Sequence, residues 1–175
     1  MPLVKGKQSG NHRKLILIAG LTLILALGAG CQNSGSLQEN LVPKAARKGK
    51  WVTVARVVDG DTFVTDNRVR IRLIGVDTPE STKRHDPYGR EAAEFTRSRL
   101  SGQEVRLEYD VDRTDKYGRT LAYVFLPDGV FFNALLVEEG YARIMTVPPN
   151  VKYAKKFLAL ERQARQEDRG LWRQR

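Results

Sequence analysis

The sequence predicts an α+β protein, mainly β, in which three helices pack on a small five-stranded barrel. Five short segments show the alternation and the β-branched or aromatic residues that are typical of strands, and turn residues separate them. Three further segments have apolar residues at helical spacing. The predicted order is strand, strand, strand, helix, strand, strand, helix, helix. Short strands in this order favour a barrel with helices packed on it.

The first three strands are predicted to follow one another directly. Residues 51–58 alternate and are rich in valine, and Asp59-Gly60 is a turn signal. A second strand covers 62–65, and Asp66-Asn67 turns the chain into a third strand over 69–74. Tight turns between neighbouring strands predict an antiparallel meander.

Strand alternation and the helical spacing of apolar residues also identify the remaining predicted elements. They are a helix over 89–100, strands over 105–109 and 121–126, a short helix that begins near Phe132 and stops at Gly140, and a basic helix over 153–164 that ends near Gly170.

Composition narrows the class of protein. The chain has 175 residues, with 30 Lys and Arg against 20 Asp and Glu, for a formal charge of +10. The length suits one domain plus extra sequence, and 41% hydrophobic residues exclude a wholly disordered chain. The single cysteine excludes an intramolecular disulfide framework and a Cys-rich zinc site, and two histidines leave little room for His-based metal binding.

The positive charge is unevenly distributed along the chain. Residues 31–50 carry a net charge of +3 and residues 152–175 a net charge of +5. Residues 51–151, in contrast, contain 14 basic and 16 acidic side chains. An acidic central segment in a basic protein points to carboxylates that are gathered around a cation.

The first 30 residues predict a signal peptide. Arg13 and Lys14 precede the uncharged stretch 15–30, which is shorter than the ~20 residues that a membrane-spanning helix needs. Small residues end this stretch directly before Cys31, and the pattern resembles a bacterial lipoprotein signal in which the cysteine is acylated and anchors the protein to the membrane. Ordinary cleavage with secretion and a retained anchor are the alternatives.

This signal predicts the organisation of the whole chain. Residues 31–50 are polar and lack apolar periodicity, so they predict a flexible basic linker. Residues 51–175 form the predicted folded domain. The predicted location is outside the cytoplasm, either as a lipoprotein of the cell envelope or as a secreted protein.

Two acidic motifs lie at predicted strand ends. Asp59-Gly60-Asp61-Thr62 taken alone is a hairpin turn, and Asp77-Thr78-Pro79-Glu80 taken alone is a solvated loop. If the first three strands pair, however, four carboxylates gather at neighbouring strand ends and repel one another unless a cation joins them. Because no Cys or nearby His is available, the suited cation is Ca²⁺ or Mg²⁺, which take oxygen ligands.

Arginines accompany these carboxylates. Arg72 lies on the third predicted strand, and the turn 113–119 contains two arginines, a lysine and a tyrosine. Taken alone these are a surface arginine and a charged turn. An arginine fork suits bidentate contacts with phosphate, and a cation site combined with arginines suits phosphoryl chemistry.

Three motifs together resemble the staphylococcal nuclease (thermonuclease) family. They are 59–62 (DGDT), 72–80 (RLIGVDTPE) and 113–123 (RTDKYGRTLAY), and the resemblance covers about residues 51–172. The combination and its order are highly specific, whereas none of the three motifs is specific alone. The resemblance implies an OB-fold barrel and Ca²⁺-dependent cleavage of DNA and RNA.

The resemblance also implies ligands for the cation. Asp61 and Asp77 would bind Ca²⁺ through their carboxylates and Thr78 through its main-chain carbonyl. Asp59 and Thr62 would act on the cation through water.

The remaining family roles concern the substrate. Glu80 would be the general base that takes a proton from the attacking water. Arg72 and Arg119 would clamp the phosphate and stabilise the five-coordinate transition state. Lys116 and Tyr117 would hold a neighbouring phosphate or nucleotide.

Two departures from the family pattern affect substrate recognition. The loop between Glu80 and Tyr88 is shorter, and Thr146 stands where a tyrosine stacks on a base. The alternative function is a non-catalytic OB-fold module that binds nucleic acid or an envelope partner. Retention of all the acids and arginines named above favours the enzyme.

Overall fold

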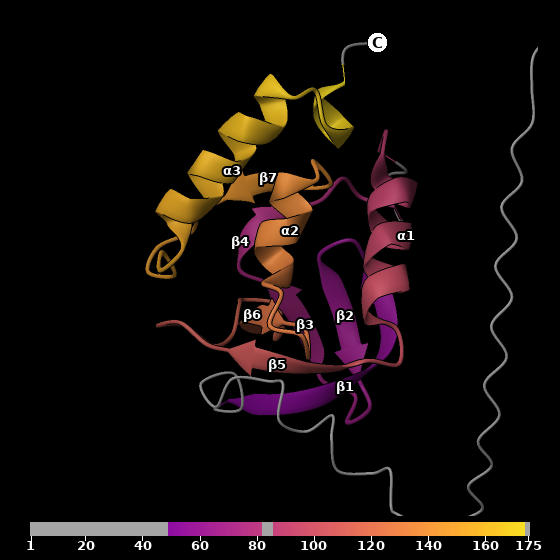
Figure 1. Ribbon diagram of the computed structural model, residues 1–175. Coiled ribbons are helices and arrows are strands. Elements are labelled where there is room, and N and C mark those ends of the chain that lie inside the picture. The colour runs from indigo at the N-terminus through magenta and orange to yellow at the C-terminus, as the bar shows by residue number, and fades with distance from the viewer. Residues whose placement is uncertain (1–48, 82–85, 174–175) are drawn as a thin grey trace, which may run out of the picture. The chain divides into compact units, whose positions relative to one another are not determined.

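The computed structural model describes residues 49–81 and 86–173 (Figure 1). The predicted signal peptide, the predicted acylation site Cys31 and nearly all of the predicted linker lie outside the described residues, so these remain predictions. Within the described part, no helix is long and apolar enough to cross a membrane.

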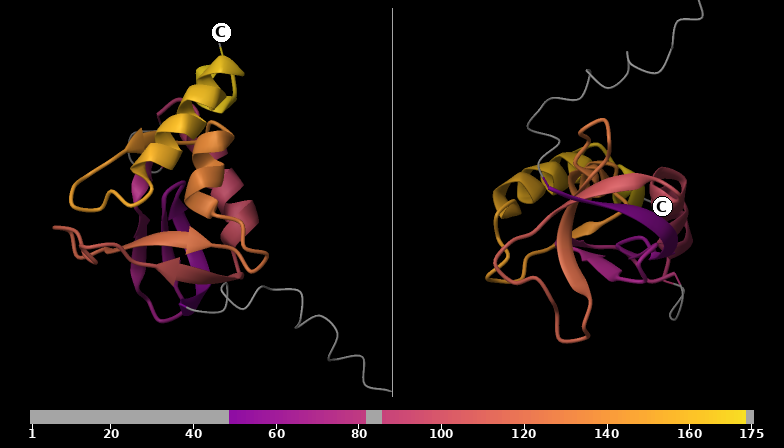
Figure 2. Two further views of the ribbon diagram at one scale, coloured as in Figure 1. Left: turned by 60° about the vertical axis from the view of Figure 1, so that its left-hand side comes forward. Right: turned by 90° about the horizontal axis from the view of Figure 1, so that it is seen from below.

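Five strands form a closed barrel in the order β1-β2-β3-β6-β5. The first three pair antiparallel in sequence, and β3 pairs parallel with β6. Figure 2 shows the barrel from two further sides. The predicted five-stranded barrel and its antiparallel meander are confirmed. The strands are β1 (Lys50–Asp59), β2 (Thr62–Thr65), β3 (Arg70–Leu73), β5 (Glu104–Glu108) and β6 (Thr120–Phe125).

A second, two-stranded sheet was not predicted. It pairs β4 (Gly75–Asp77) with β7 (Arg143–Met145), so that Val76 lies opposite Ile144. The single strand predicted over 69–74 therefore ends at Leu73, and the chain leaves the barrel before Asp77. Strands of three residues are too short to show a periodicity. This departure from the barrel places Asp77 beside the β1–β2 turn.

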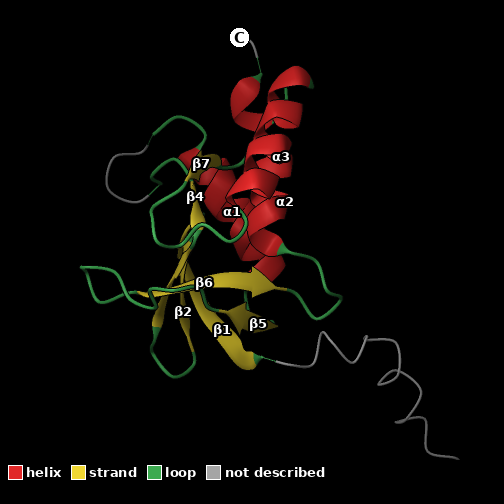
Figure 3. Ribbon diagram, turned by 90° about the vertical axis from the view of Figure 1, so that its left-hand side faces the viewer, coloured by secondary structure: helices red, strands yellow, loops and turns green. Residues whose placement is uncertain are grey.

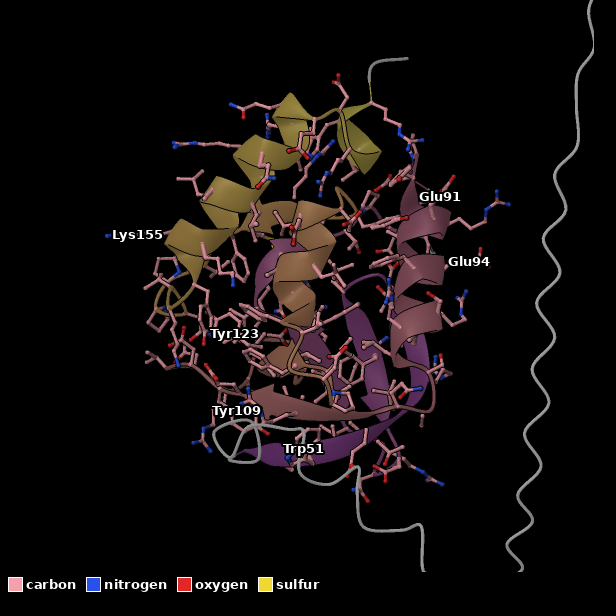
Figure 4. All side chains as sticks on the ribbon, in the orientation of Figure 1. Trp51, Glu91, Glu94, Tyr109, Tyr123 and Lys155 are labelled. Carbon is pink, nitrogen blue, oxygen red and sulfur yellow. The ribbon has the colours of Figure 1, made fainter. Side chains whose placement is uncertain are left out.

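Three helices cover one end and one side of the barrel, as predicted (Figure 3). Helix α1 (Gly89–Leu100) packs on β1, α2 (Phe132–Glu138) packs on β6 and on α3 (Ala154–Gln166), and a short 3₁₀ helix, η2 (Gly170–Trp172), follows. Helix α1 buries Ala92, Ala93 and Leu100 against the barrel and turns its charged residues to solvent. Figure 4 shows Glu91 and Glu94 on the outer side of this helix.

The core fills the barrel and the space between β6 and the helices. Val57, Phe63 and Ile71 lie opposite one another on β1, β2 and β3 and are buried. Tyr123 is 1% exposed and donates a hydrogen bond to Asp110. Full burial of one such side chain contributes about 1.5–3 kcal/mol. Because side chains alternate along a strand, residues beside the buried row face outward.

Candidate active site

The outward side of β1, β2 and β3 continues into a cleft of about 520 Å³. Nine of the residues that the sequence predicted for the site line this cleft. They are Asp59, Asp61, Thr62, Arg72, Asp77, Thr78, Glu80, Tyr117 and Arg119.

The β1–β2 turn holds the first two carboxylates close to the chain after β4. Gly60 allows this approach, because a Cβ atom at that position would lie 2.7 Å from the Thr78 side chain. The hydroxyl of Thr96 on α1 donates a 2.6 Å hydrogen bond to the Gly60 carbonyl. The backbone N–H of Thr78 donates to Asp61 Oδ2 at 3.0 Å. Strand, helix and loop therefore fix this turn from three sides.

Arg72 joins the two predicted cation-binding carboxylates. Its Nη2 lies 3.1 Å from Asp61 Oδ2 and 2.9 Å from Asp77 Oδ1. Its Nη1 donates to the carbonyls of Leu73 and Val76 at 2.8 and 2.7 Å. The Arg72 side chain is 7% exposed. The guanidinium is thus held in one orientation by three hydrogen-bond acceptors and by the ion pair with Asp61.

Partial burial raises the pKa of Asp77 above its ordinary value of 3.8, and the nearby negative charge of Asp61 adds to this effect. The positive charge of Arg72 opposes it. A cation at these carboxylates would favour their ionised forms in the same way.

The donor atoms around Asp61 fit a hard cation. Asp61, Asp77 and the Thr78 carbonyl offer oxygen only, which is the ligand type that Ca²⁺ and Mg²⁺ take. In addition, Thr78 Oγ1 is buried without a hydrogen-bond partner. Within residues 49–81 and 86–173, no three His, Cys, Asp or Glu side chains are arranged to hold a metal ion. The predicted ligand set does not need three, because its third member is a main-chain carbonyl.

Asp59 connects the barrel to the loop that carries Glu80. Its carboxylate accepts hydrogen bonds from the Gly60 N–H at 3.0 Å and the Ser81 hydroxyl at 2.7 Å. Burial raises the pKa of Asp59, the Ser81 hydrogen bond lowers it, and a hydrogen bond with the Glu80 side chain raises it. Asp59 and Glu80 are therefore in direct contact, and Ser81 anchors the chain beside them.

The backbone of Glu80 is fixed by the start of α1. The Asp86 N–H donates to the Glu80 carbonyl at 2.8 Å, and the Glu80 N–H donates to Asp86 Oδ2 at 3.3 Å. A Cβ atom at Gly89 would lie 2.5 Å from the Glu80 carbonyl oxygen, so only glycine allows the helix this close. These contacts hold Glu80 at the edge of the cleft.

Arg119 reaches the cleft from the connection between β5 and β6, which extends away from the barrel (Figure 2). Its Nε donates to Asp115 Oδ2 at 2.6 Å, and the backbone N–H groups of Tyr117 and Arg119 donate to Asp115 Oδ1. Burial alone would raise the pKa of Asp115, but these hydrogen bonds hold it below its ordinary value. One carboxylate thus organises the whole turn.

Tyr117 and Lys116 lie at the outer edge of this turn. Tyr117 is 71% exposed, and Lys116 Nζ lies 5.1 Å from the centre of its ring. Lys116 does not line the cleft; it lines a neighbouring hollow of about 580 Å³ that Tyr117 shares. Thr146, which stands where the family pattern has a stacking tyrosine, is exposed.

Three residues of the site were missed by sequence reasoning. Ser81 and Asp115 hold other site residues in place, and Arg70 lines the cleft directly. Arg70 precedes Arg72 by two residues on the same predicted strand, so strand alternation could have identified it.

Fold and cleft together define a small β-barrel protein with one open, charged cleft. Buried carboxylates and three arginines line this cleft, and such a site suits a reaction at a phosphate group.

Comparison with known proteins identifies the family. A family model described as staphylococcal nuclease homologue matches residues 70–174. The thermonuclease of Staphylococcus intermedius is 46% identical over 131 residues, which cover 71% of this chain and 77% of that protein. The thermonuclease of Staphylococcus hyicus is 45% identical over 125 residues, covering 68% and 73%. The chain belongs to the staphylococcal nuclease family, and it is a nuclease.

A more distant relative is also named as a nuclease. Endonuclease YncB of Bacillus subtilis is 37% identical over 129 residues, which cover 69% of this chain and 61% of that protein. The predicted resemblance and the predicted barrel fold are thereby confirmed. The assignment as a hydrolase of nucleic acid is confirmed at the level of the family.

Proposed function

We propose that this nuclease is Ca²⁺-dependent, does not select a nucleotide sequence, and hydrolyses phosphodiester bonds of both DNA and RNA. One observation carries the proposal: a single cleft is lined by Glu80, by the carboxylates of Asp61 and Asp77, and by two arginines that are ion-paired with carboxylates, Arg72 and Arg119. Two further features support it: the oxygen-only donor set and the positions of the family motifs.

Asp61, Asp77 and the carbonyl of Thr78 would hold the cation. Bound there, Ca²⁺ would supply Lewis-acid stabilisation of a phosphate oxygen. Arg72 already offsets the repulsion between Asp61 and Asp77 by contacting both. The chain can therefore keep the two carboxylates together before a cation binds, which lowers the reorganisation that binding requires.

Glu80 would act as the general base. It lines the same cleft as Asp61 and Asp77, and its backbone is fixed to the start of α1. A carboxylate in this position can take a proton from a water molecule that attacks the phosphorus atom.

Arg72 and Arg119 would stabilise the transition state from two directions. Arg72 comes from the barrel and Arg119 from the β5–β6 connection, and both line the cleft. Their guanidinium groups donate hydrogen bonds where negative charge grows on the phosphate oxygens. Removal of one such donor typically lowers the rate about 10²–10³-fold.

Lys116 and Tyr117 would contact the substrate beyond the reacting phosphate. Tyr117 presents an exposed ring and Lys116 a positive charge beside it. A ring of this kind can stack on any base, and this suits a nuclease without sequence preference.

The experiment uses the purified protein with single-stranded DNA and RNA oligonucleotides, with Ca²⁺, with Mg²⁺ and with chelator. We expect cleavage of both nucleic acids with Ca²⁺ and none with chelator. Replacement of Glu80 by alanine should leave the fold intact and lower the cleavage rate by about 10²–10³-fold or more. Glu94→Gln on the outer side of α1 is the matched control (Figure 4).

Binding without cleavage by the wild-type protein would instead support the alternative, a non-catalytic OB-fold module. Full Ca²⁺-dependent cleavage by the Glu80→Ala protein would contradict the role of Glu80. Cleavage that persists in chelator would contradict the Ca²⁺ dependence.

A further inference from the structure

Two exposed arginines lie on the barrel strands near the cleft, in one row of residues paired across β1, β2 and β3. The row that contains Thr62 and Arg72 is called the catalytic row below. Arg56 on β1 and Arg70 on β3 both lie in the row of Val64 on β2: Arg56 pairs with Val64, and Val64 pairs with Arg70. The next outward-facing row in the direction of the cleft contains Thr62 and Arg72, which also pair directly. Residues paired across antiparallel strands project from the same face of a sheet.

The row of Arg56, Val64 and Arg70 faces outward. The row between it and the catalytic row is formed by Val57, Phe63 and Ile71 and is buried in the core. Alternation along each strand therefore turns the arginine row to the same side as the catalytic row. Arg56 and Arg70 are exposed, and Arg70 lines the cleft itself.

The two arginines differ from those already assigned to the reaction. Arg72 is bound to Asp61 and Asp77, and Arg119 is bound to Asp115. In the part of the chain that the structure describes, the side chains of Arg56 and Arg70 make no hydrogen bond or ion pair. Their charges are therefore not offset by an acidic partner there.

We propose that Arg56 and Arg70 bind backbone phosphates of the substrate strand next to the phosphate that is cleaved. This inference rests on the proposed function, because it takes the cleft between Asp61 and Arg119 as the place of cleavage. It adds a path for the strand: from the cleft, over Val64, along the outer face of β1, β2 and β3.

The spacing of the residues fits such a path. Arg70 and Arg72 are two residues apart on one strand, which places their Cα atoms about 6.6 Å apart. That separation is close to one phosphate step along an extended single strand. Val64, which lies between Arg56 and Arg70, is half-buried and uncharged. A sugar or base can therefore pass over it without desolvating a charged group.

The position and charge of Arg56 and Arg70 favour a nucleic-acid strand over an acidic protein as the ligand of this row. The row is continuous with a cleft whose substrate is a phosphodiester, through Arg70. Residues 51–175, the predicted folded domain, contain 22 basic and 19 acidic residues, so net charge attracts a long polyanion only weakly. It has to be held by unpaired cations at defined positions.

The test compares the double variant Arg56→Gln/Arg70→Gln with the wild-type protein on single-stranded (dT)₁₆ and Ca²⁺. We expect KM to rise about tenfold while kcat stays within about twofold, because the lost contacts lie outside the reacting phosphate. The slope of log(kcat/KM) against log[salt] should become shallower by about 1.4, since each phosphate contact on a single strand contributes about 0.7.

A charge-matched control is Arg97→Gln/Arg162→Gln. Both residues are exposed on helices α1 and α3, and neither lines the cleft. This control should keep the wild-type KM and salt slope. Thermal melts of both double variants should stay within about 2 °C of the wild type, since all four side chains are exposed.

Two results would overturn the proposal. The first is a KM and salt slope of Arg56→Gln/Arg70→Gln equal to those of the control. The second is a fall of kcat at unchanged KM, which would place the arginines on the reaction itself. Failure of the proposed function is a separate result, because the wild-type protein would then not cleave (dT)₁₆ with Ca²⁺.

Discussion

Two of the three arginines that line the cleft, Arg72 and Arg119, are held in opposite ways. Arg72 lies on a barrel strand, and its side chain is 7% exposed. Asp77 and two carbonyls accept its hydrogen bonds, and Asp61 Oδ2 lies 3.1 Å from its Nη2. Arg119 lies on the β5–β6 connection, its side chain is 27% exposed, and Asp115 is its one ionic partner among the described residues. One arginine is part of the folded core, and the other belongs to a turn that the core does not constrain.

This difference separates two tasks of a phosphate site. Arg72 holds the carboxylates together and contributes to stability as well as to chemistry. Arg119 can adjust to the substrate because its position depends on one short turn. Removal of each arginine should therefore affect activity alike but affect stability very differently.

Replacement of Arg72 by glutamine should have the largest effect. It removes the guanidinium that contacts both Asp61 and Asp77, and loss of one partner of a buried pair costs about 3–5 kcal/mol. Because the Asp77 side chain is 53% exposed, we expect a smaller loss, about 2–3 kcal/mol. Calorimetry should show a decrease in Tm of about 10 °C, and cleavage should fall about 10²–10³-fold.

Added Ca²⁺ should recover part of the lost Tm of the Arg72→Gln protein, because a cation between the carboxylates replaces the guanidinium charge. If the Arg72→Gln and wild-type proteins have the same Tm when both are measured without Ca²⁺, Arg72 does not hold the carboxylates together.

Replacement of Arg119 by glutamine should affect activity without affecting stability. We expect cleavage to fall about 10²–10³-fold. Tm should change by less than about 2 °C, because a partly exposed ion pair contributes little to stability. Parallel rate measurements and thermal melts check this. A large decrease in Tm would remove the distinction between the two arginines.

Replacement of Asp115 by asparagine should have the smallest effect on the rate, about tenfold, through a less well oriented Arg119. The pKa of Asp115 in the folded protein is below its ordinary value of 3.8. Its ionised form therefore stabilises the fold above that ordinary value, and this contribution is lost as the pH falls through the lowered pKa.

The Asp115→Asn protein should thus be less stable than the wild type at pH 7 by about 1 kcal/mol, and the difference should vanish well below pH 3.8. Urea unfolding at several pH values measures it. A difference that does not depend on pH would mean that the charge of Asp115 plays no part.

The sequence predicted the parts of the fold that depend on local patterns. Strand alternation and tight turns identified the meander, and helical spacing identified α1. The approach of Asp59 and Asp61 to the third strand followed from the same strands, because consecutive antiparallel strands bring their ends together. Asp77 joins them through β4, which lies outside the barrel.

The rest depends on contacts between distant segments. The pairing of β4 with β7 joins residues 75–77 to 143–145, and nothing local in either segment predicts it. The hydrogen bond from Ser81 to Asp59 likewise depends on how the loop folds back onto the barrel. The arginine row of Arg56 and Arg70 became visible only with the register of β1, β2 and β3.

The central claim is that Glu80 acts as the base in a cleft where Ca²⁺ and the arginines hold the phosphate. The most direct measurement is the single-turnover rate of (dT)₁₆ cleavage by the wild-type and Glu80→Ala proteins, with protein in excess and Ca²⁺ at saturation. We expect the rate to fall about 10²–10³-fold or more with unchanged Tm and unchanged binding of the oligonucleotide. An undiminished rate in the Glu80→Ala protein would contradict the account.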